Sequence, residues 1–401
     1  MIIASIMDPA LFVALVLCTA LFCFISGCIP LGATALFVDL ALYLSGIIDA
    51  KTALKDFSSQ NVMIIAGLAI VGEAMFRTGA AAQIGVFLKK VAKSERILVF
   101  WLVMGSGILS GFLSNNGCAA LIMALTLGIC LSTGFRRCKL MYPIAVGICY
   151  VGGMTTVGSN STLYLKGILE GIGPQYTMDF FELAPLCLIL TFVSAVFLAT
   201  VGFKLMPEES YNQLDPSYAK TPDYSKIPAW KRKLSVAIFL ATILGMCFEK
   251  QIGISVGMTA LIATLAIVST GLLTDKEAFR AIPMTAVLMY ACMVPVSKAM
   301  TTSGASKYIV SFMQHLLGGT DSSLIVILLI YAIIVPLTNV MSNSATVIMF
   351  TPVALAVATS MNMNPKAVLM TLRMAATIAV ATPISMTPTT MAVEPGGISI
   401  C

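Results

Sequence analysis

Long apolar runs, separated by short polar or charged clusters, fill most of the chain from Leu11 to Ile400. Several of these runs reach or exceed the ~20 apolar residues that a helix needs to cross a bilayer. The runs between charge clusters predict helices near residues 10–28, 30–47, 61–79, 141–157, 162–172, 180–204, 232–248, 252–273, 281–299 and 367–382. The pattern therefore predicts an all-α polytopic membrane protein.

Two further stretches carry no charge over about twice the length of one span. They comprise 39 residues at 97–135 and 44 residues at 322–365. A polar cluster interrupts each near its centre, Ser114-Asn115-Asn116-Gly117 in the first and Ser342-Asn343-Ser344 in the second. Each stretch is either two full spans with a short loop or a re-entrant hairpin whose polar tip stops inside the membrane. Both arrangements return the chain to the side where it started.

Composition agrees with a membrane protein and excludes several other classes. Only 10% of the 401 residues are charged, 58% are hydrophobic and the mean hydropathy is +0.96, whereas soluble domains carry about 25% charged residues. The net charge of +6 comes from sparse Lys and Arg, so nucleic-acid binding is not indicated. The eleven Cys include no CxxC pair and His315 is the single His, which argues against a disulfide framework and a His-rich metal site.

The distribution of positive charge predicts an orientation, because loops rich in Lys and Arg stay in the cytoplasm. We assume that the chain enters and leaves each doubled stretch on the same side of the membrane. Most Lys and Arg then lie on one side, including Arg136, Arg137 and the positive residues of segment 206–231. The first hairpin is then expected to open inward, the second outward, and segment 206–231 to be a cytoplasmic linker. We expect a multi-pass protein of the plasma or inner membrane.

The polar interruptions recur along the chain. Ser114-Asn115 and Ser342-Asn343 are 228 residues apart, and two later breaks, Gly158-Ser159 and Thr387-Pro388, are 229 apart. Because the hairpins open to opposite sides, the halves are expected to be inverted-topology repeats, each with a re-entrant hairpin and a broken helix. Such repeats are typical of secondary transporters, whose sites lie near paired helix breaks.

The repeat predicts how the chain is divided. The first repeat is residues 1–205, with hairpin 97–135, broken helix 141–172 and span 180–204, and the linker follows at 206–231. The second repeat is residues 232–401, with hairpin 322–365 and broken helix 367–398. Span 180–204 has no counterpart after residue 398. The second repeat is therefore expected to lack its last span, either natively or by truncation.

The breaks themselves indicate what the site binds. Unwound backbone at membrane depth is tolerated where it lines a cavity, and there carbonyls can hold a cation while helix N-termini favour an anion. Residues 152–162 and 382–390 are rich in Gly, Ser, Thr and Pro. Hydroxyl, amide and carbonyl oxygens form a hard, neutral cage that suits Na⁺ better than a transition metal.

At these residues the chain resembles the divalent anion:sodium symporter family, which carries dicarboxylates, citrate or sulfate. The family has two Ser-Asn-Thr motifs at hairpin tips and two downstream breaks, one glycine-serine and one threonine-proline. Here the corresponding positions are Ser114-Asn115, Ser342-Asn343, Gly158-Ser159 and Thr387-Pro388. The third motif residue differs, being Asn116 in one half and Ser344 in the other, and the Pro-Pro-Asn that follows each break in the family is absent.

The resemblance implies a set of binding residues. One Na⁺ would be held by Ser110, Ser114, Asn115 and the carbonyl of Gly158. A second Na⁺ would involve Thr338, Asn343 and the carbonyls of Met341 and Met386. The carboxylates of the anion would meet Asn115, Asn116, Ser159, Asn343, Ser344, Thr387 and Pro388. The resemblance also implies a homodimer in the bilayer, with Na⁺ as the coupling ion.

Several polar and small residues have a simpler structural interpretation. A single Ser-Asn in a membrane protein is more often a helix cap or an interhelical hydrogen bond. Gly105, Gly107 and Gly111 are expected to allow close helix packing. Two pairs, Glu73 with Arg77 and Lys166 with Glu170, are four residues apart and are expected to neutralise each other. For Arg373 and Glu394 we favour structural or helix-end roles.

The sequence thus predicts a secondary active transporter that couples Na⁺ to uptake of a divalent organic anion, with a C4-dicarboxylate as the favoured substrate. One alternative is the large membrane subunit of a binding-protein-dependent tripartite transporter, or an anion exchanger. Another is a non-transporting sensor on the same fold. An enzyme is not expected, because no nucleophile, base and orienting partner occur together.

Overall fold

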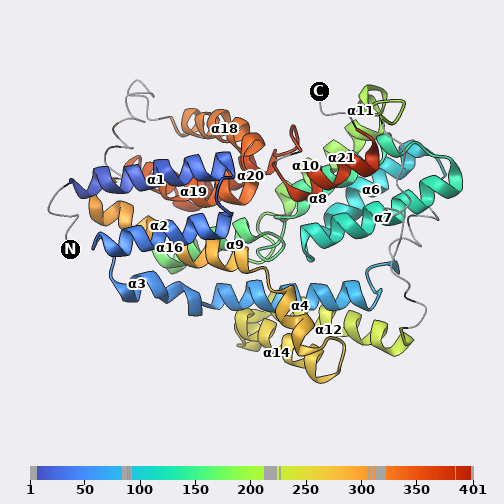
Figure 1. Ribbon diagram of the computed structural model, residues 1–401, viewed down its shortest axis with the longest axis horizontal. Coiled ribbons are helices and arrows are strands. Elements are labelled where there is room, and N and C mark those ends of the chain that lie inside the picture. The colour runs from blue at the N-terminus through green and yellow to red at the C-terminus, as the bar shows by residue number, and fades with distance from the viewer. Residues whose placement is uncertain are drawn as a thin grey trace. The chain divides into compact units, whose positions relative to one another are not determined.

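The computed structural model describes residues 7–83, 88, 90, 93–211, 224, 227–305, 308, 311, 322–383 and 385–398. Within these residues the regular secondary structure is helical (Figure 1). The chain forms two compact units, and α4 (Gln60–Arg77) passes from one to the other after Ile65. Most of the predicted linker 206–231 lies outside the described residues.

The first unit comprises Met1–Ile65, Asn160–Met178 and Pro283–Ala379. Besides the start of α4, it contains α1 (Pro9–Ser26), α2 (Leu31–Leu44), α3 (Ala50–Lys55), η2 (Asp56–Ser58), α9 (Asn160–Ile172), η4 (Pro174–Tyr176), α16 (Met284–Ser303), α18 (Ser323–Val340), α19 (Asn343–Ser360) and α20 (Pro365–Thr377). α16 packs against α2, α9 and α19, and α20 packs against α18 and α19.

The second unit comprises Ala66–Ser159, Asp179–Ile282 and Val380–Cys401. Besides the rest of α4, it contains α6 (Glu95–Ser110), α7 (Asn115–Thr133), η3 (Arg137–Lys139), α8 (Met141–Val151), α10 (Ala184–Ala199), α11 (Val201–Leu205), α12 (Ala229–Cys247), α13 (Glu249–Ile252), α14 (Val256–Ser269), α15 (Asp275–Ala281) and α21 (Thr387–Gly396). α8 packs against α6, α7 and α10.

The structure confirms a polytopic helical membrane protein. Six helical segments of the described chain are long and apolar enough to cross a membrane: Pro9–Ser26, Ala50–Arg77, Asn115–Thr133, Met284–Ser303, Ser323–Val340 and Asn343–Ser360. Many large apolar side chains on the surface, such as Leu15, Phe22 and Leu265, are more than half exposed. Such faces are stable in contact with lipid.

Each doubled stretch folds as a pair of helices joined at its polar cluster. α6 ends at Ser110 and α7 begins at Asn115, while α18 ends at Val340 and α19 begins at Asn343. Each predicted broken helix is also interrupted, between α8 and α9 and between α20 and α21. The inverted orientation of the two repeats and their boundaries at 205 and 232 stay predictions.

The arms of the two broken helices separate into different units. In the first unit α9, from the first half of the sequence, packs against α19 and α20 from the second half. In the second unit α21, from the second half, packs against α7 and α8 from the first half. Each hairpin therefore packs beside the second arm of the broken helix that comes from the other half of the sequence.

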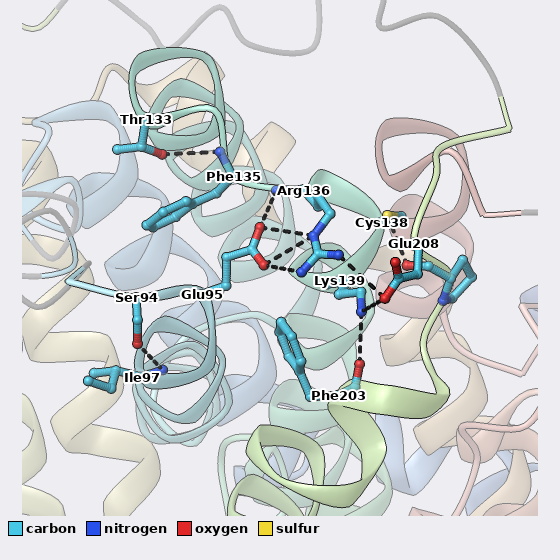
Figure 2. A network of polar contacts seen from close by, with 11 residues as sticks. Ser94, Glu95, Ile97, Thr133, Phe135, Arg136, Cys138, Lys139, Phe203 and Glu208 are labelled. Carbon is cyan, nitrogen blue, oxygen red and sulfur yellow. Dashed lines mark hydrogen bonds and ion pairs between the residues drawn. The ribbon is translucent and has the colours of Figure 1, made fainter.

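An ionic network, which we call the hairpin clamp, joins the two open ends of the first hairpin. It consists of Glu95, Arg136, Lys139, Phe203 and Glu208 (Figure 2). The Arg136 backbone N–H donates to Glu95 Oε1 at 2.7 Å, and Arg136 Nη2 donates to Glu95 Oε2 at 2.7 Å. Because Glu95 begins α6 and Arg136 follows α7, these bonds fix the spacing of the hairpin arms.

The rest of the hairpin clamp holds the start of α8. The Lys139 side chain is almost completely buried, and its Nζ donates to the Phe203 carbonyl at 3.1 Å and to Glu208 Oε1 at 3.3 Å. The same Nζ lies 4.5 Å from the centroid of the Phe203 ring, a cation–π contact. The first hairpin, α8 and α11 are therefore tied together at one end.

The hairpin clamp predicts how stability depends on Glu95 and on pH. Burial favours the neutral acid, but hydrogen bonds and charge from Arg136 outweigh burial and hold the pKa of Glu95 below its ordinary value. A lowered pKa contributes stability that is present at neutral pH and is lost as the pH falls below about 4. We expect Glu95→Gln to reduce the free energy of unfolding by about 1–3 kcal/mol at pH 7.

Thermal unfolding of the purified protein in detergent measures this difference. The gap in Tm between wild type and Glu95→Gln is expected to close on acidification. Glu209→Gln, which alters an exposed neighbouring carboxylate, is the control and is expected to match wild type. Equal Tm values for Glu95→Gln and wild type at neutral pH would contradict a stabilising clamp.

Candidate functional site

Both Ser-Asn pairs stand at the N-terminus of the second helix of a hairpin. The Ser114 hydroxyl accepts a hydrogen bond from the Gly117 N–H at 3.3 Å, and the Ser342 hydroxyl accepts one from the Ala345 N–H at 3.3 Å. The two serines therefore cap α7 and α19, in agreement with the simpler interpretation of a single Ser-Asn. The caps also place Asn115 and Asn343 at the first position of each helix, where the helix dipole favours negative charge.

Three of the four residues predicted for the first Na⁺ converge in the second unit. The buried Ser110 hydroxyl donates to Asn115 Oδ1 at 2.6 Å. A Cβ atom built on Gly152 would lie 2.9 Å from the same Oδ1, and a Cβ on Gly158 would lie 2.6 Å from the Gly152 carbonyl oxygen. The side-chain oxygens of the hairpin tip thus approach the backbone of the break after α8.

Gly158 occupies a space that admits no side chain. A Cβ atom added to it would lie 2.5 Å from the Gly111 carbonyl oxygen as well as 2.6 Å from that of Gly152. Real Cβ atoms are not found so close to backbone oxygen, so only glycine allows these carbonyls to approach. Two carbonyl oxygens from different segments therefore lie close to one position in the break.

Thr155 joins the hairpin tip to the break by hydrogen bonds. The sequence analysis did not single it out within the break 152–162. Its hydroxyl donates to the Gly111 carbonyl at 2.5 Å and accepts from the Gly158 N–H at 2.9 Å. The residue is completely buried. One hydroxyl thereby joins the hairpin tip to the break, and the only sequence signal was its place among small hydroxylic residues.

The chemistry of this cluster fits an alkali cation. Its donors are hydroxyl, amide and carbonyl oxygens of Ser110, Asn115, Gly111 and Gly152, all of them neutral. No group of three or more His, Cys, Asp or Glu side chains with metal-ligand spacing occurs in the described part of the chain. Neutral oxygen donors suit a hard cation better than a transition metal.

Residues predicted for the second Na⁺ are divided between the units. Thr338, Met341 and Asn343 belong to the first unit and are all buried, whereas Met386 belongs to the second. The Met386 carbonyl accepts the Thr389 hydroxyl at 2.6 Å in the first turn of α21. The second Na⁺ site stays a prediction.

The second hairpin is tied to the break after α20 by two hydrogen bonds. The Thr338 hydroxyl donates to the Ala376 carbonyl at 3.0 Å, and Asn339 Nδ2 donates to the Ile378 carbonyl at 2.9 Å. Asn339 was not singled out from the sequence, although it adjoins Thr338. Its amide supplies a donor to backbone at the end of α20, where the helix stops providing one.

One of these bonds has a counterpart in the other hairpin. The Ser106 hydroxyl of α6 donates to the Ile144 carbonyl of α8 at 3.1 Å. Donor and acceptor are separated by 38 residues, as they are for Thr338 and Ala376. This hydrogen bond makes Ser106 the counterpart of Thr338. The sequence had instead paired Thr338 with Ser110, which lies four residues after Ser106. The recurrence is consistent with a repeated hairpin and broken helix.

The predicted anion ligands differ in exposure. Asn116 and Thr387 are exposed, Asn115, Ser159 and Ser344 are half-buried, and Asn343 and Pro388 are buried. Thr387 and Pro388 begin α21, so they share with Asn115 and Asn343 a position at a helix N-terminus. The seven residues are therefore placed mainly where backbone N–H groups are not used within the helix.

The structure tests several of the simpler structural interpretations and contradicts one of them. Glu73 pairs with Arg77 at 2.6 Å and Lys166 pairs with Glu170 at 3.7 Å. A Cβ on Gly107 would lie 2.8 Å from the Gly147 carbonyl and one on Gly111 would lie 2.7 Å from Met154, so both glycines allow close packing. The expectation for Gly105 was wrong, because a Cβ there would meet nothing within 4 Å.

Arg373 has the structural role that we favoured. Its guanidinium is almost completely buried on α20, and Nε donates to the Thr162 hydroxyl in the first turn of α9 at 2.9 Å. A second guanidinium nitrogen donates to the Thr377 hydroxyl at the end of α20. Arg373 thus joins one arm of each broken helix within the first unit.

Comparison with known proteins places these features in a family. The citrate transporter family matches residues 20–372. An uncharacterized transporter of Escherichia coli strain K12, YfbS, is 30% identical over 47% of this chain and 31% of its own length. The chain thus spans about a third of that relative.

Two further proteins match over a larger share of both chains. The sodium-dependent dicarboxylate transporter SdcS of Staphylococcus saprophyticus is 19% identical over 94% of this chain and 78% of its own. The crystal structure of the Alcanivorax borkumensis YdaH transporter superposes with a TM-score of 0.54 at 15% identity. That match covers 86% of this chain and 81% of the YdaH chain, and it shows a shared fold.

The family match covers well over half of the chain, and the relatives named are transporters. The resemblance at the two Ser-Asn pairs and the two breaks agrees with this result. The helical fold and its membrane-spanning helices agree with it as well. The chain is therefore a multi-pass membrane protein that belongs to the citrate transporter family and fits the divalent anion:sodium symporters.

Proposed function

We propose that this protein is a secondary active transporter that couples Na⁺ entry to the uptake of a divalent organic anion. A C4-dicarboxylate is the favoured substrate, since SdcS, which aligns with almost the whole chain, is named a sodium-dependent dicarboxylate transporter. Citrate is the second candidate, because the matched family is described as citrate transporters.

The observation that carries the proposal is the convergence of neutral oxygens at Gly158. Ser110, Asn115 and the carbonyls of Gly111 and Gly152 surround the break without any carboxylate among the residues named. In the proposed mechanism Na⁺ occupies this cage as a transported ion, held by Ser110, Ser114, Asn115 and the Gly158 carbonyl. A cation there places positive charge next to the N-terminus of α7.

The anion site follows from that charge. The dianion is proposed to bind at the helix N-termini that begin at Asn115, Asn343 and Thr387, with Asn116, Ser159, Ser344 and Pro388 completing its surroundings. Bound Na⁺ and N-terminal N–H groups together offset the cost of removing two carboxylates from water. Transport then needs no covalent step and proceeds by alternating access, in which the loaded site is exposed to one side at a time.

Uptake into liposomes tests the function. Purified protein is expected to accumulate radiolabelled succinate only with an inward Na⁺ gradient, and Asn115→Ala or Asn343→Ala is expected to abolish accumulation. Ser132→Ala, at the other end of α7 and exposed, should leave uptake unchanged. Equal uptake with and without the Na⁺ gradient would indicate an exchanger. Citrate and sulfate are measured in parallel, and failure of all three anions would overturn the proposal.

The cage itself is tested by adding one methyl group. In Gly158→Ala the new Cβ would displace the Gly111 and Gly152 carbonyls, so the Na⁺ concentration for half-maximal uptake is expected to rise at least tenfold, or uptake to be lost. Gly105→Ala is the matched control, because a Cβ there meets nothing within 4 Å. Wild-type Na⁺ dependence in Gly158→Ala would exclude a cation site at this break.

A further inference from the structure

A buried carboxyl lies in the first unit, apart in sequence from every residue of the proposed transport site. Asp39 is the only charged residue of α2, and its exposed fraction is 3%. It lies on the face of α2 that also buries Ala35, Val38 and Leu42, each exposed by 1% or less. The sequence analysis did not single out this residue, although it is the one acidic side chain within the apolar run 30–47 and ionisable residues inside membrane segments are functional candidates.

No described residue neutralises this carboxyl. Asp39 Oδ1 is buried and has no hydrogen-bond partner in the described part of the chain. The ion pairs of that part join other residues, and none involves Asp39. Asp39 therefore lacks the partners that normally accompany a buried charge.

The titratable groups around Asp39 do not supply a compensating cation. α2 packs against α1, α3 and α16. The titratable groups within electrostatic reach of Asp39 are the Asp56 carboxyl of η2, which follows α3, and the neutral Cys292 thiol of α16, and neither is a cation. α1 carries no charged residue. The lysines of α3 and α16, namely Lys51, Lys55 and Lys298, are exposed.

An ionised carboxylate in this position would be costly. Burying an unpaired charge costs far more than burying a neutral acid, and the neighbouring Asp56 would add repulsion between like charges. A metal cation would need several oxygen ligands, and the described part of the chain holds no group of three or more His, Cys, Asp or Glu side chains that could bind one. A proton needs only the carboxyl and one acceptor.

The adjacent helix α16 contains a backbone carbonyl that lacks its usual helical donor. Pro295 lies inside α16 and has no N–H, so the Ala291 carbonyl lacks its usual donor one turn further along the helix. Ala291 adjoins Cys292, whose thiol lies within electrostatic reach of Asp39. α16 thus carries a backbone carbonyl without its usual donor at the residue before Cys292.

We propose that Asp39 is a proton-binding site within the first unit, occupied by a proton in the conformation of this structure. The proton forms an O–H bond with one carboxyl oxygen, so the side chain is neutral and is buried between α2 and α16. Loss of this proton leaves an unpaired negative charge in an apolar environment and weakens the packing of these two helices.

Infrared difference spectroscopy tests the site directly. The spectrum of wild type minus Asp39→Asn in mildly acidic buffer is expected to contain the C=O stretch of a protonated carboxylic acid, and this band should disappear as the pH is raised. Asp275→Asn removes an exposed carboxylate from α15, and its difference spectrum should contain carboxylate bands only. A carboxylate band in place of the acid band for Asp39 would overturn the proposal.

Thermal unfolding provides a second readout. In the unfolded chain Asp39 is hydrated and ionises freely, so raising the pH favours unfolding when the folded state must keep the proton. The Tm of wild type should therefore fall relative to that of Asp39→Asn as the pH rises from acidic to neutral values. Asp39→Ser, a smaller neutral variant, serves if Asp39→Asn does not fold. An identical pH dependence of Tm for wild type and the neutral variant would contradict a bound proton.

Neither measurement involves a transported anion, so failure of the proposed function leaves both results interpretable. If the proposed function holds, Na⁺-driven succinate uptake by wild type should decline as the pH rises from mildly acidic to neutral values, whereas uptake by Asp39→Asn should not. A decline of equal size in both proteins would show that Asp39 does not determine it and would count against the proposal.

Discussion

The rest of this structure depends on one constraint, which is that every backbone N–H and C=O group inside a membrane must find a partner without water. Continuous helices meet this constraint automatically, but the breaks after α8 and α20 do not. The chain meets it there with side chains. Thr155 binds the Gly111 carbonyl, Thr338 binds the Ala376 carbonyl and Asn339 binds the Ile378 carbonyl. The unwound segments are thereby fixed to the adjacent hairpins.

This constraint explains why binding residues and structural residues are the same or adjacent. A carbonyl that no helix uses is available both to a hydroxyl and to a cation, and the N–H groups at a helix start are available both to a cap and to an anion. Ser114 and Ser342 cap their helices, while the next residue of each pair belongs to the proposed site. A transporter can therefore bind hydrophilic cargo with few charged side chains.

The helices were predictable from the sequence because uncharged runs and polar interruptions are local signals. Both hairpin tips and both breaks appeared at the expected residues. The packing of the arms was not predictable, since the contact of α9 with α19 and α20 joins segments that are far apart in the chain. Gly105 was grouped with Gly107 and Asp39 was overlooked, because neither packing space nor the absence of a partner is visible in residue order.

The exchange of arms between the halves has a consequence for biosynthesis. The first unit needs residues 1–65 together with 283–379, so its N-terminal helices cannot complete their packing until most of the chain has been synthesised. α1, α2 and α3 therefore lack their packing partners from residues 283–379 until about two hundred further residues have emerged from the ribosome. During this interval the carboxyl of Asp39 has no α16 to cover it, and lipid, water or an insertion factor is its neighbour.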